Sequence, residues 1–94
     1  MNKEILQAIA GKKVVAFIYQ NYIRIAEPHI YGVFGGVDRL LVWQIRGGPT
    51  AAQLPSVAVP QITEFQVFDE TFSGKRADSV SHHLQWDATF AMVR

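Results

Sequence analysis

Apolar residues recur at helical spacing only at the start of the chain. Ile5, Leu6 and Ile9 fall on one face at i, i+1 and i+4, and Gly11 is typical of the position just past a helix end. This pattern predicts one short helix over residues 3–10. A helix of that length is marginal in water, so we expect it to dock on the rest of the protein by its apolar face.

From Val14 onward the pattern is that of β-strands. Residues 14–19 form an unbroken β-branched and aromatic run, which is typical of a strand covered on both faces. Further strands are predicted over residues 22–34, 39–46, 56–59, 62–68 and 88–94. Gln20-Asn21 and Gly35-Gly36 supply tight turns. Pro28 cannot donate a ladder hydrogen bond, so it marks a strand end, an edge or a bend, and Gly32 indicates a bulge or kink.

One helix followed by several short strands predicts a mainly β fold. We expect a small SH3-like or Sm-like β-barrel with a short N-terminal helix, because closure removes the exposed edges of an open sheet. The 94 residues suit a single domain over 1–94. Its core is expected over about residues 4–72, and the polar extension over 73–94 is expected to wrap around the barrel.

Composition narrows the possible partners and location. The chain has no cysteine, which excludes disulfides and thiol catalysis and fits a reducing cytoplasm. It has no apolar signal region and no run long enough for a membrane span, so we predict a cytoplasmic protein. Nine Lys and Arg against eight Asp and Glu give a net charge of +1, so nucleic acid would need a local patch. A domain this small is marginally stable alone, and we therefore expect a protein partner or a homodimer.

Catalytic and metal motifs are not recognisable in the sequence. His82 and His83 are adjacent and would point to opposite faces of a strand, and neither they nor His29 have a metal-binding spacing. There is no GxSxG elbow, and neither glycine pair has the context of a phosphate-binding loop. We predict no catalytic residues, no metal and no cofactor. Glu27 is interpreted as a structural partner for a nearby backbone group or cation.

Cations and aromatic residues on strands are the remaining candidates. They are Arg24, Tyr31, Arg39, Trp43 and Arg46, and we predict Arg24, Tyr31, Trp43 and Arg46 as the ligand-binding residues. Strict alternation places Trp43 on one face of its strand, in the core or at its rim, and Arg46 on the other. An Arg on a strand is commonly a solvated outer residue, but Arg beside aromatic rings at a barrel mouth can bind phosphate or stack a base.

The ordered series "ILQAIAGKKVVAFIY", "RIAEPHIYG", "LLVWQ" and "VAVPQITEFQVFDETF" resembles the WYL domain family, in particular its small stand-alone members. The likeness runs over about residues 4–72, and Arg-x-x-Glu-Pro (Arg24, Glu27, Pro28) is its most specific piece. The resemblance implies an SH3-like or Sm-like barrel with a ligand-sensing role, often inside bacterial transcription regulators. It also implies nucleotides or single-stranded nucleic acid as ligands, with Arg24 facing the ligand and Arg46 as a second basic position.

The sequence departs from the family pattern at two places. The Trp-Tyr-Leu triplet falls on Arg39-Leu40-Leu41, so only Leu41 matches. Val57 and Ala58 stand where the family carries an aromatic and then a basic residue, so an anion pocket would lack a principal donor. The chain also has no helix-turn-helix, so promoter regulation by this chain alone is not expected.

Two hypotheses therefore remain open from the sequence. The first is a non-catalytic regulatory module in which Arg24 and Arg46 hold an anionic ligand and Tyr31 and Trp43 offer stacking surfaces. The alternative is a degenerate barrel that acts through protein–protein contacts or oligomerisation and holds no ligand.

Overall fold

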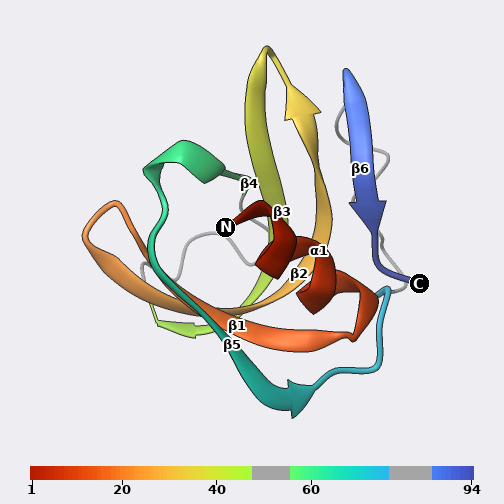
Figure 1. The fold of residues 1–94 in the computed structure, drawn as a ribbon. Coiled ribbons are helices and arrows are strands. Elements are labelled where there is room, and N and C mark those ends of the chain that lie inside the picture. The colour runs from red at the N-terminus through yellow and green to blue at the C-terminus, as the bar shows by residue number, and fades with distance from the viewer. Residues whose placement is uncertain (48–55, 77–85) are drawn as a thin grey trace.

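The computed structural model describes residues 1–47, 56–76 and 86–94. The elements are α1 (Asn2–Ala10), β1 (Lys13–Tyr19), β2 (Tyr22–Phe34), β3 (Val37–Gly47), β4 (Ser56–Ala58), the 3-10 turn η1 (Val59–Gln61), β5 (Thr63–Thr71) and β6 (Ala88–Met92) (Figure 1). His82 and His83, for which the sequence predicts no metal role, lie outside the described residues. No helix in the described ranges is both long enough and apolar enough to cross a membrane.

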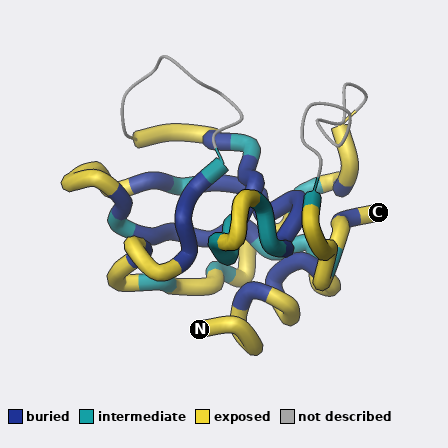
Figure 2. The backbone as a smooth tube through the Cα atoms, turned by 90° about the horizontal axis from the view of Figure 1, so that it is seen from above, coloured by how far each residue is buried: buried dark blue, intermediate teal, exposed yellow. Residues whose placement is uncertain are grey.

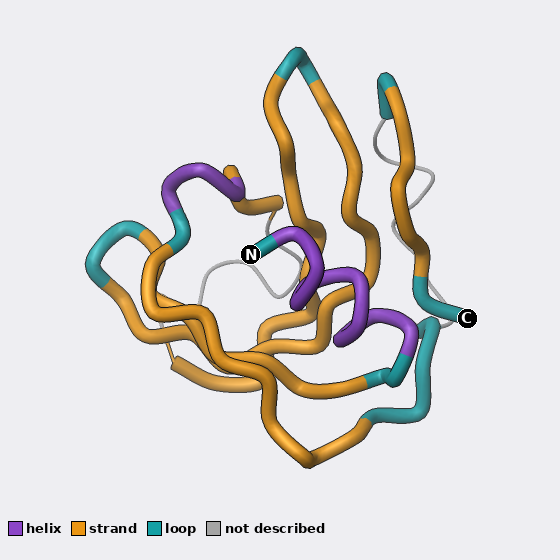
Figure 3. Tube along the Cα trace, viewed as in Figure 1, coloured by secondary structure: helices purple, strands orange, loops and turns teal. Residues whose placement is uncertain are grey.

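The six strands form one antiparallel sheet in the order β4-β3-β2-β1-β5, with β6 paired to β2 (Figures 1 and 3). The mainly β class and the short N-terminal helix are confirmed. The sheet is not closed into a barrel, so the SH3-like barrel stays a prediction. The length of β2 explains the topology: its first part pairs with β1, as in Val15↔Ala26, and its last part pairs with β6, as in Ile30↔Met92.

Both predicted hairpin turns are present. Gln20 and Asn21 have φ of 52° and 69°, and Gly35 and Gly36 have φ of 60° and 75°. Two consecutive left-handed residues give the turn whose twist matches that of two paired strands. The second turn forms the tip of the long β2–β3 hairpin (Figure 3).

The helix α1 docks by its apolar stripe on one face of the sheet (Figure 1). Ile5, Ala8 and Ile9 are its buried residues, at i, i+3 and i+4, and they join the main core of the protein. Leu6, which the sequence placed on the docking face, is exposed. The buried residues of the sheet lie along its inner strands, whereas the chain termini and hairpin tips are exposed (Figure 2).

The two faces of β2 and β3 have different neighbours. We call the face that carries Ala26, Leu40 and Val42 the core face, because these residues belong to the main core with α1. Glu27 and Trp43 pair across the strands and alternate with those residues, so they lie on the opposite face, which we call the outer face.

Pro28 lies inside β2 and does not end the strand. It pairs with Val42 on β3, and a register shift follows between Pro28 and Ile30. The described pairs of β1 with β2 extend to Ala26, and those of β6 begin at Ile30. Pro28 therefore lies between the β1-paired and β6-paired parts of β2, on the edge opposite β3. The N–H that proline lacks would have no strand partner there, so no hydrogen bond between strands is lost.

The polar extension contributes to the fold through its last residues. β6 pairs with β2, and Val93 is buried in the main core. Gly32 permits this pairing, because a Cβ at that position would lie 2.2 Å from the carbonyl oxygen of Ala88. The register of β2 with β6 shifts between Tyr31 and Gly32, which agrees with the predicted bulge, and the close approach of the two backbones there requires a glycine.

Candidate functional site

A cluster of polar and aromatic side chains lies on the outer face of β2. We call it the outer-face cluster; it consists of Glu27, His29, Trp43, Phe72 and Arg76. Three of these residues come from the β2–β3 hairpin, while Phe72 and Arg76 follow β5 in the chain. Phe72 also packs against the main core, so the cluster joins the middle of the sheet to the segment that leaves β5.

The carboxylate of Glu27 is the centre of this cluster. It is buried, and it accepts a two-pronged contact from Arg76, with Nε 3.1 Å from Oε1 and Nη2 2.7 Å from Oε2. A buried carboxylate is costly without a partner, and the planar guanidinium is the cation best shaped to bind both oxygens. The interpretation of Glu27 as a partner for a cation agrees with this ion pair.

His29 holds the carboxylate from the other side. Its Nε2 lies 3.2 Å from Oε1 of Glu27, and its ring stacks on Phe72 with centroids 5.7 Å apart and planes at 5°. Burial lowers the pKa of His29 below 6.5, and Arg76 adds to this, although the contact with Glu27 acts in the opposite direction. The imidazole is therefore neutral at pH 7 and donates its Nε2 proton to Glu27. A buried, stacked and hydrogen-bonded histidine is suited to holding its neighbour and not to meeting a substrate.

Arg76 is fixed and yet accessible. Its guanidinium carbon lies 4.2 Å from the ring centroid of Trp43, while two of its nitrogens bind Glu27. Its side chain nevertheless remains 44% exposed. Nη1 has no hydrogen-bond partner within the described ranges. The result is a guanidinium that is held in place by an ion pair and an indole and still presents donors to solvent.

Arg24 lies on the core face, away from this cluster. It is 5% exposed, and its Nε lies 3.4 Å from the carbonyl oxygen of Tyr19. Nη1 donates to Oε1 of Gln44 at 3.3 Å, and the guanidinium carbon lies 5.2 Å from the Tyr19 ring centroid. Gln44 in turn donates to the carbonyl of Gly47. In this conformation the guanidinium of Arg24 is engaged in internal contacts that tie the ends of β1, β2 and β3 together.

Tyr31 is also on the core face, and it is 2% exposed. Its ring meets Phe90 edge to face, with centroids 5.1 Å apart. Burial raises the pKa of the Tyr31 hydroxyl, and the neighbouring Asp38, which accepts its hydrogen bond, raises it further. Tyr31 thus joins β6 to the core and offers little surface for stacking.

Arg46 lies on the same face as Trp43, contrary to strict alternation. It pairs with Ile25, while Gln44 pairs with Ala26, so Ile45 is an extra residue in β3. This bulge turns the exposed Arg46 to the outer face. Of the four predicted ligand residues, the structure brings Trp43 and Arg46 to one face and leaves Arg24 and Tyr31 on the other. Their role as ligand contacts stays a prediction.

Two members of the cluster were missed by sequence reasoning. Arg76 and Phe72 follow β5 in a segment without regular apolar spacing, so no pattern marks them. The available signal was Glu27 itself: a carboxylate within an apolar strand needs a cation, and the chain had to supply one from elsewhere.

Within the ranges that the structure describes, no group of three or more His, Asp or Glu side chains is placed to hold a metal ion. Comparisons of the chain with protein-family models, curated proteins and solved structures gave no match.

Proposed function

We propose that the chain is a non-catalytic, cytoplasmic binding module of the WYL type, built on an SH3-like barrel. Its ligand is an anion such as a nucleotide or a short single-stranded nucleic acid, bound on the outer face. The observation that carries this proposal is the guanidinium of Arg76, fixed over Trp43 by Glu27 and 44% exposed.

The fixed position of Arg76 favours binding because its side chain loses little conformational entropy when a ligand binds. A mobile arginine gives up side-chain entropy when it takes hold of a phosphate, whereas Arg76 is already held by Glu27 and Trp43. Glu27 offsets the charge of Arg76. Arg46 is exposed on the same face, so the three side chains of Glu27, Arg76 and Arg46 together carry one net positive charge. A phosphate would meet Arg46 and the free edge of Arg76.

Trp43 adds a surface on which a nucleobase can stack beside the anion contact. The guanidinium of Arg76 covers one face of the indole, at 4.2 Å from its centroid. A nucleobase can stack on the solvent side of a guanidinium plane or on the accessible part of an indole, and such contacts tolerate any base. We therefore expect a preference for single strands over duplex, with little dependence on base sequence.

The direct test is fluorescence anisotropy with a labelled oligodeoxythymidylate at low salt. We expect saturable binding that weakens as salt rises, because phosphate contacts release counterions. Arg46→Gln should weaken binding by about three- to tenfold and lower the salt slope by about one. Lys3→Gln, which removes an exposed cation on α1, is the matched control and should leave binding unchanged. The proposal fails if the wild type does not bind at low salt or if Lys3→Gln weakens binding as much as Arg46→Gln.

A second candidate function is self-association through β6. This strand has no charged residue, one of its edges pairs with β2, and Phe90 is 51% exposed. Among the described strands β6 pairs only with β2, and a strand edge without charge or proline is a template for pairing. The net charge of +1 opposes a second copy only weakly. We expect light scattering to show a dimer that Thr89→Lys converts to monomer. A monomeric wild type at high protein concentration would rule this candidate out.

A further inference from the structure

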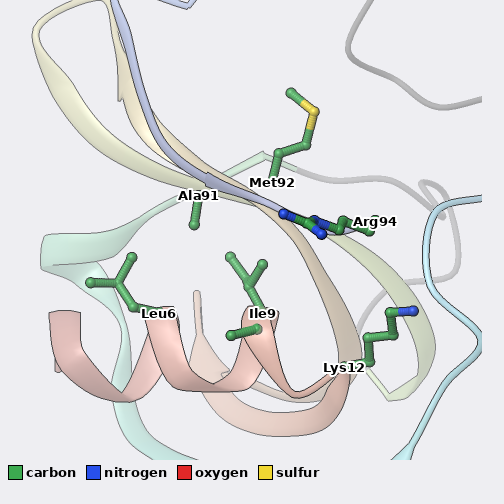
Figure 4. A pocket seen from close by; sticks show the side chains of 7 residues that line it. Leu6, Ile9, Lys12, Ala91, Met92 and Arg94 are labelled. Carbon is green, nitrogen blue, oxygen red and sulfur yellow. The ribbon is translucent and has the colours of Figure 1, made fainter.

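A groove lies between α1 and the end of β6, away from the outer face. Its volume is about 340 Å³, and it is lined by Leu6, Ile9, Ala10, Lys12, Ala91, Met92 and Arg94 (Figure 4). Five of these side chains are apolar and two are cationic. We call it the α1–β6 groove. Its size is at the lower end of the range for small-molecule sites, about 300–1,000 Å³.

The apolar and charged parts of the groove are separated. Leu6 and Ile9 point from α1 towards Ala91 on β6 (Figure 4). Lys12 follows the end of α1 and Arg94 follows the end of β6, so the two cations gather where both elements end. Leu6 is exposed, so apolar wall surface faces solvent in the free protein, whereas the side chain of Met92 points away from α1 (Figure 4). One end of the groove suits an anion and the rest suits a hydrocarbon chain.

Hydrogen bonds hold the backbones of both cationic residues in place. The amide of Lys12 donates to the carbonyl of Ile9 at 3.2 Å, and its carbonyl accepts from Phe72 at 3.0 Å. The carbonyl of Arg94 accepts from the amide of Lys75 at 3.0 Å. Neither Lys12 nor Arg94 forms a salt bridge with a side chain in the described part of the protein. Two cations on hydrogen-bonded backbones, with no side-chain carboxylate partner among the described residues, complement the charge of an anionic headgroup.

We propose that the α1–β6 groove binds a free carboxylate with a short linear acyl tail. The carboxylate lies between Lys12 and Arg94, and the tail lies against Leu6, Ile9 and Ala91. The tail then covers apolar surface that is otherwise in water, and the carboxylate supplies the charge that the two cations lack. Each methylene that enters the groove should strengthen binding by up to about fourfold, since burying one is worth about 0.8 kcal/mol.

Octanoate is the probe for this proposal, below its micelle concentration, with backbone amide NMR shifts as the readout. We expect saturable shifts confined to α1 and β6, with affinity rising from acetate through hexanoate to octanoate. 1-Octanol has the same tail without the charge, and it should bind at least about tenfold more weakly if the two cations are used. The ligand series tests the proposal without any variant and so does not depend on the folding of one.

Variants then locate the site. Leu6→Glu places a carboxylate on an exposed position of the wall and should abolish octanoate binding, and Lys12→Gln should weaken it by about fivefold. Lys3→Gln on the same helix and Val67→Glu on β5 are matched controls that should bind as the wild type does. Circular dichroism checks that each variant is folded.

Several results would overturn the proposal. Equal binding of octanoate and 1-octanol would show that the cations are not used, and equal binding of acetate and octanoate would show that the groove is not used. Shifts at the groove that grow with protein concentration without octanoate would assign it to a second copy of the chain. An absence of saturable shifts would exclude the site altogether.

Discussion

At the scale of single residues, Glu27 explains why the outer-face cluster exists. A carboxylate buried in a strand is stable only if cations and donors surround it, and Arg76 and His29 supply them. The sequence indicated that Glu27 needs a partner, but not which one, because Arg76 lies 49 residues away in a segment without a pattern. Such a long-range pair depends on the whole fold.

The ion pair can be tested by a double-mutant cycle. Arg76→Gln leaves the buried carboxylate of Glu27 without its cation, and we expect a loss of about 1–3 kcal/mol in the free energy of unfolding. This is below the range for fully buried pairs because Arg76 is partly in water. Glu27→Gln combined with Arg76→Gln should cost less than the sum of the single changes. Chemical denaturation measures all four proteins, and strict additivity would show that the pair is not coupled.

The neutral state of His29 predicts a pH dependence of stability. Burial lowers the pKa of His29 from 6.5, so between the two values the unfolded chain binds more protons than the folded one. Stability from this residue is therefore present above pH 6.5 and is lost as the pH falls towards the folded pKa. The urea concentration at the midpoint of unfolding should therefore fall as the pH is lowered from about 7.5 to about 5.5.

His29→Gln is the matched variant for that measurement. Glutamine can still donate a hydrogen bond to Glu27 but does not titrate, so the fall in its midpoint should be smaller than in the wild type. If both proteins lose the same stability over this range, the pH dependence comes from other groups and His29 is not held neutral.

At the scale of elements, alternation predicted the strands well and their faces less well. The helix, the long hairpin and both turns agree with apolar spacing and turn residues. The face of Arg46 does not, because the bulge at Ile45 shifts the register by one residue and reverses the faces of the residues after it. No local signal in "RLLVWQIR" marks that bulge. The candidate site was therefore predicted by residue type but not by geometry.

The pairing of β6 with β2 depends on Gly32. A Cβ at this position would lie 2.2 Å from the carbonyl oxygen of Ala88 and 3.1 Å from Cα of Thr89. Backbone atoms cannot yield as a flexible side chain can, so Gly32→Ala should push β6 away and cost about 1–3 kcal/mol. Hydrogen exchange should then show faster exchange of the β6 amides.

Gly11→Ala is the control for this change. Gly11 is exposed and has φ of −88°, and its nearest contact for an added Cβ is the carbonyl oxygen of Gln7 at 3.3 Å. We expect β6 to exchange in this variant as in the wild type. Unchanged protection of β6 in Gly32→Ala would contradict the close backbone approach.

At the scale of the whole molecule, the sequence predicted the class of the fold but not its connections. Closure was expected because an open sheet exposes edges, yet the described strands form an open sheet in which β2 pairs with β1, β3 and β6. Pairing between distant segments such as β2 and β6 leaves no local trace in the sequence. Arg24 and Tyr31 are buried, and their role as ligand contacts stays a prediction. Sequence alone could not place them, because an interior polar network and a ligand site use the same residue types.

We propose that the outer face of β2 and β3 binds an anion such as a nucleotide or a short single-stranded nucleic acid through Arg46, Arg76 and Trp43. The most direct measurement is an NMR titration of the ¹⁵N-labelled chain with an oligodeoxythymidylate at low salt. We expect saturable shifts at the Trp43 indole and at the amides around Arg46 and Arg76, with Arg24 and Tyr31 unaffected. Shifts confined to the core face or to the α1–β6 groove, or no shifts at all, would contradict the proposed function.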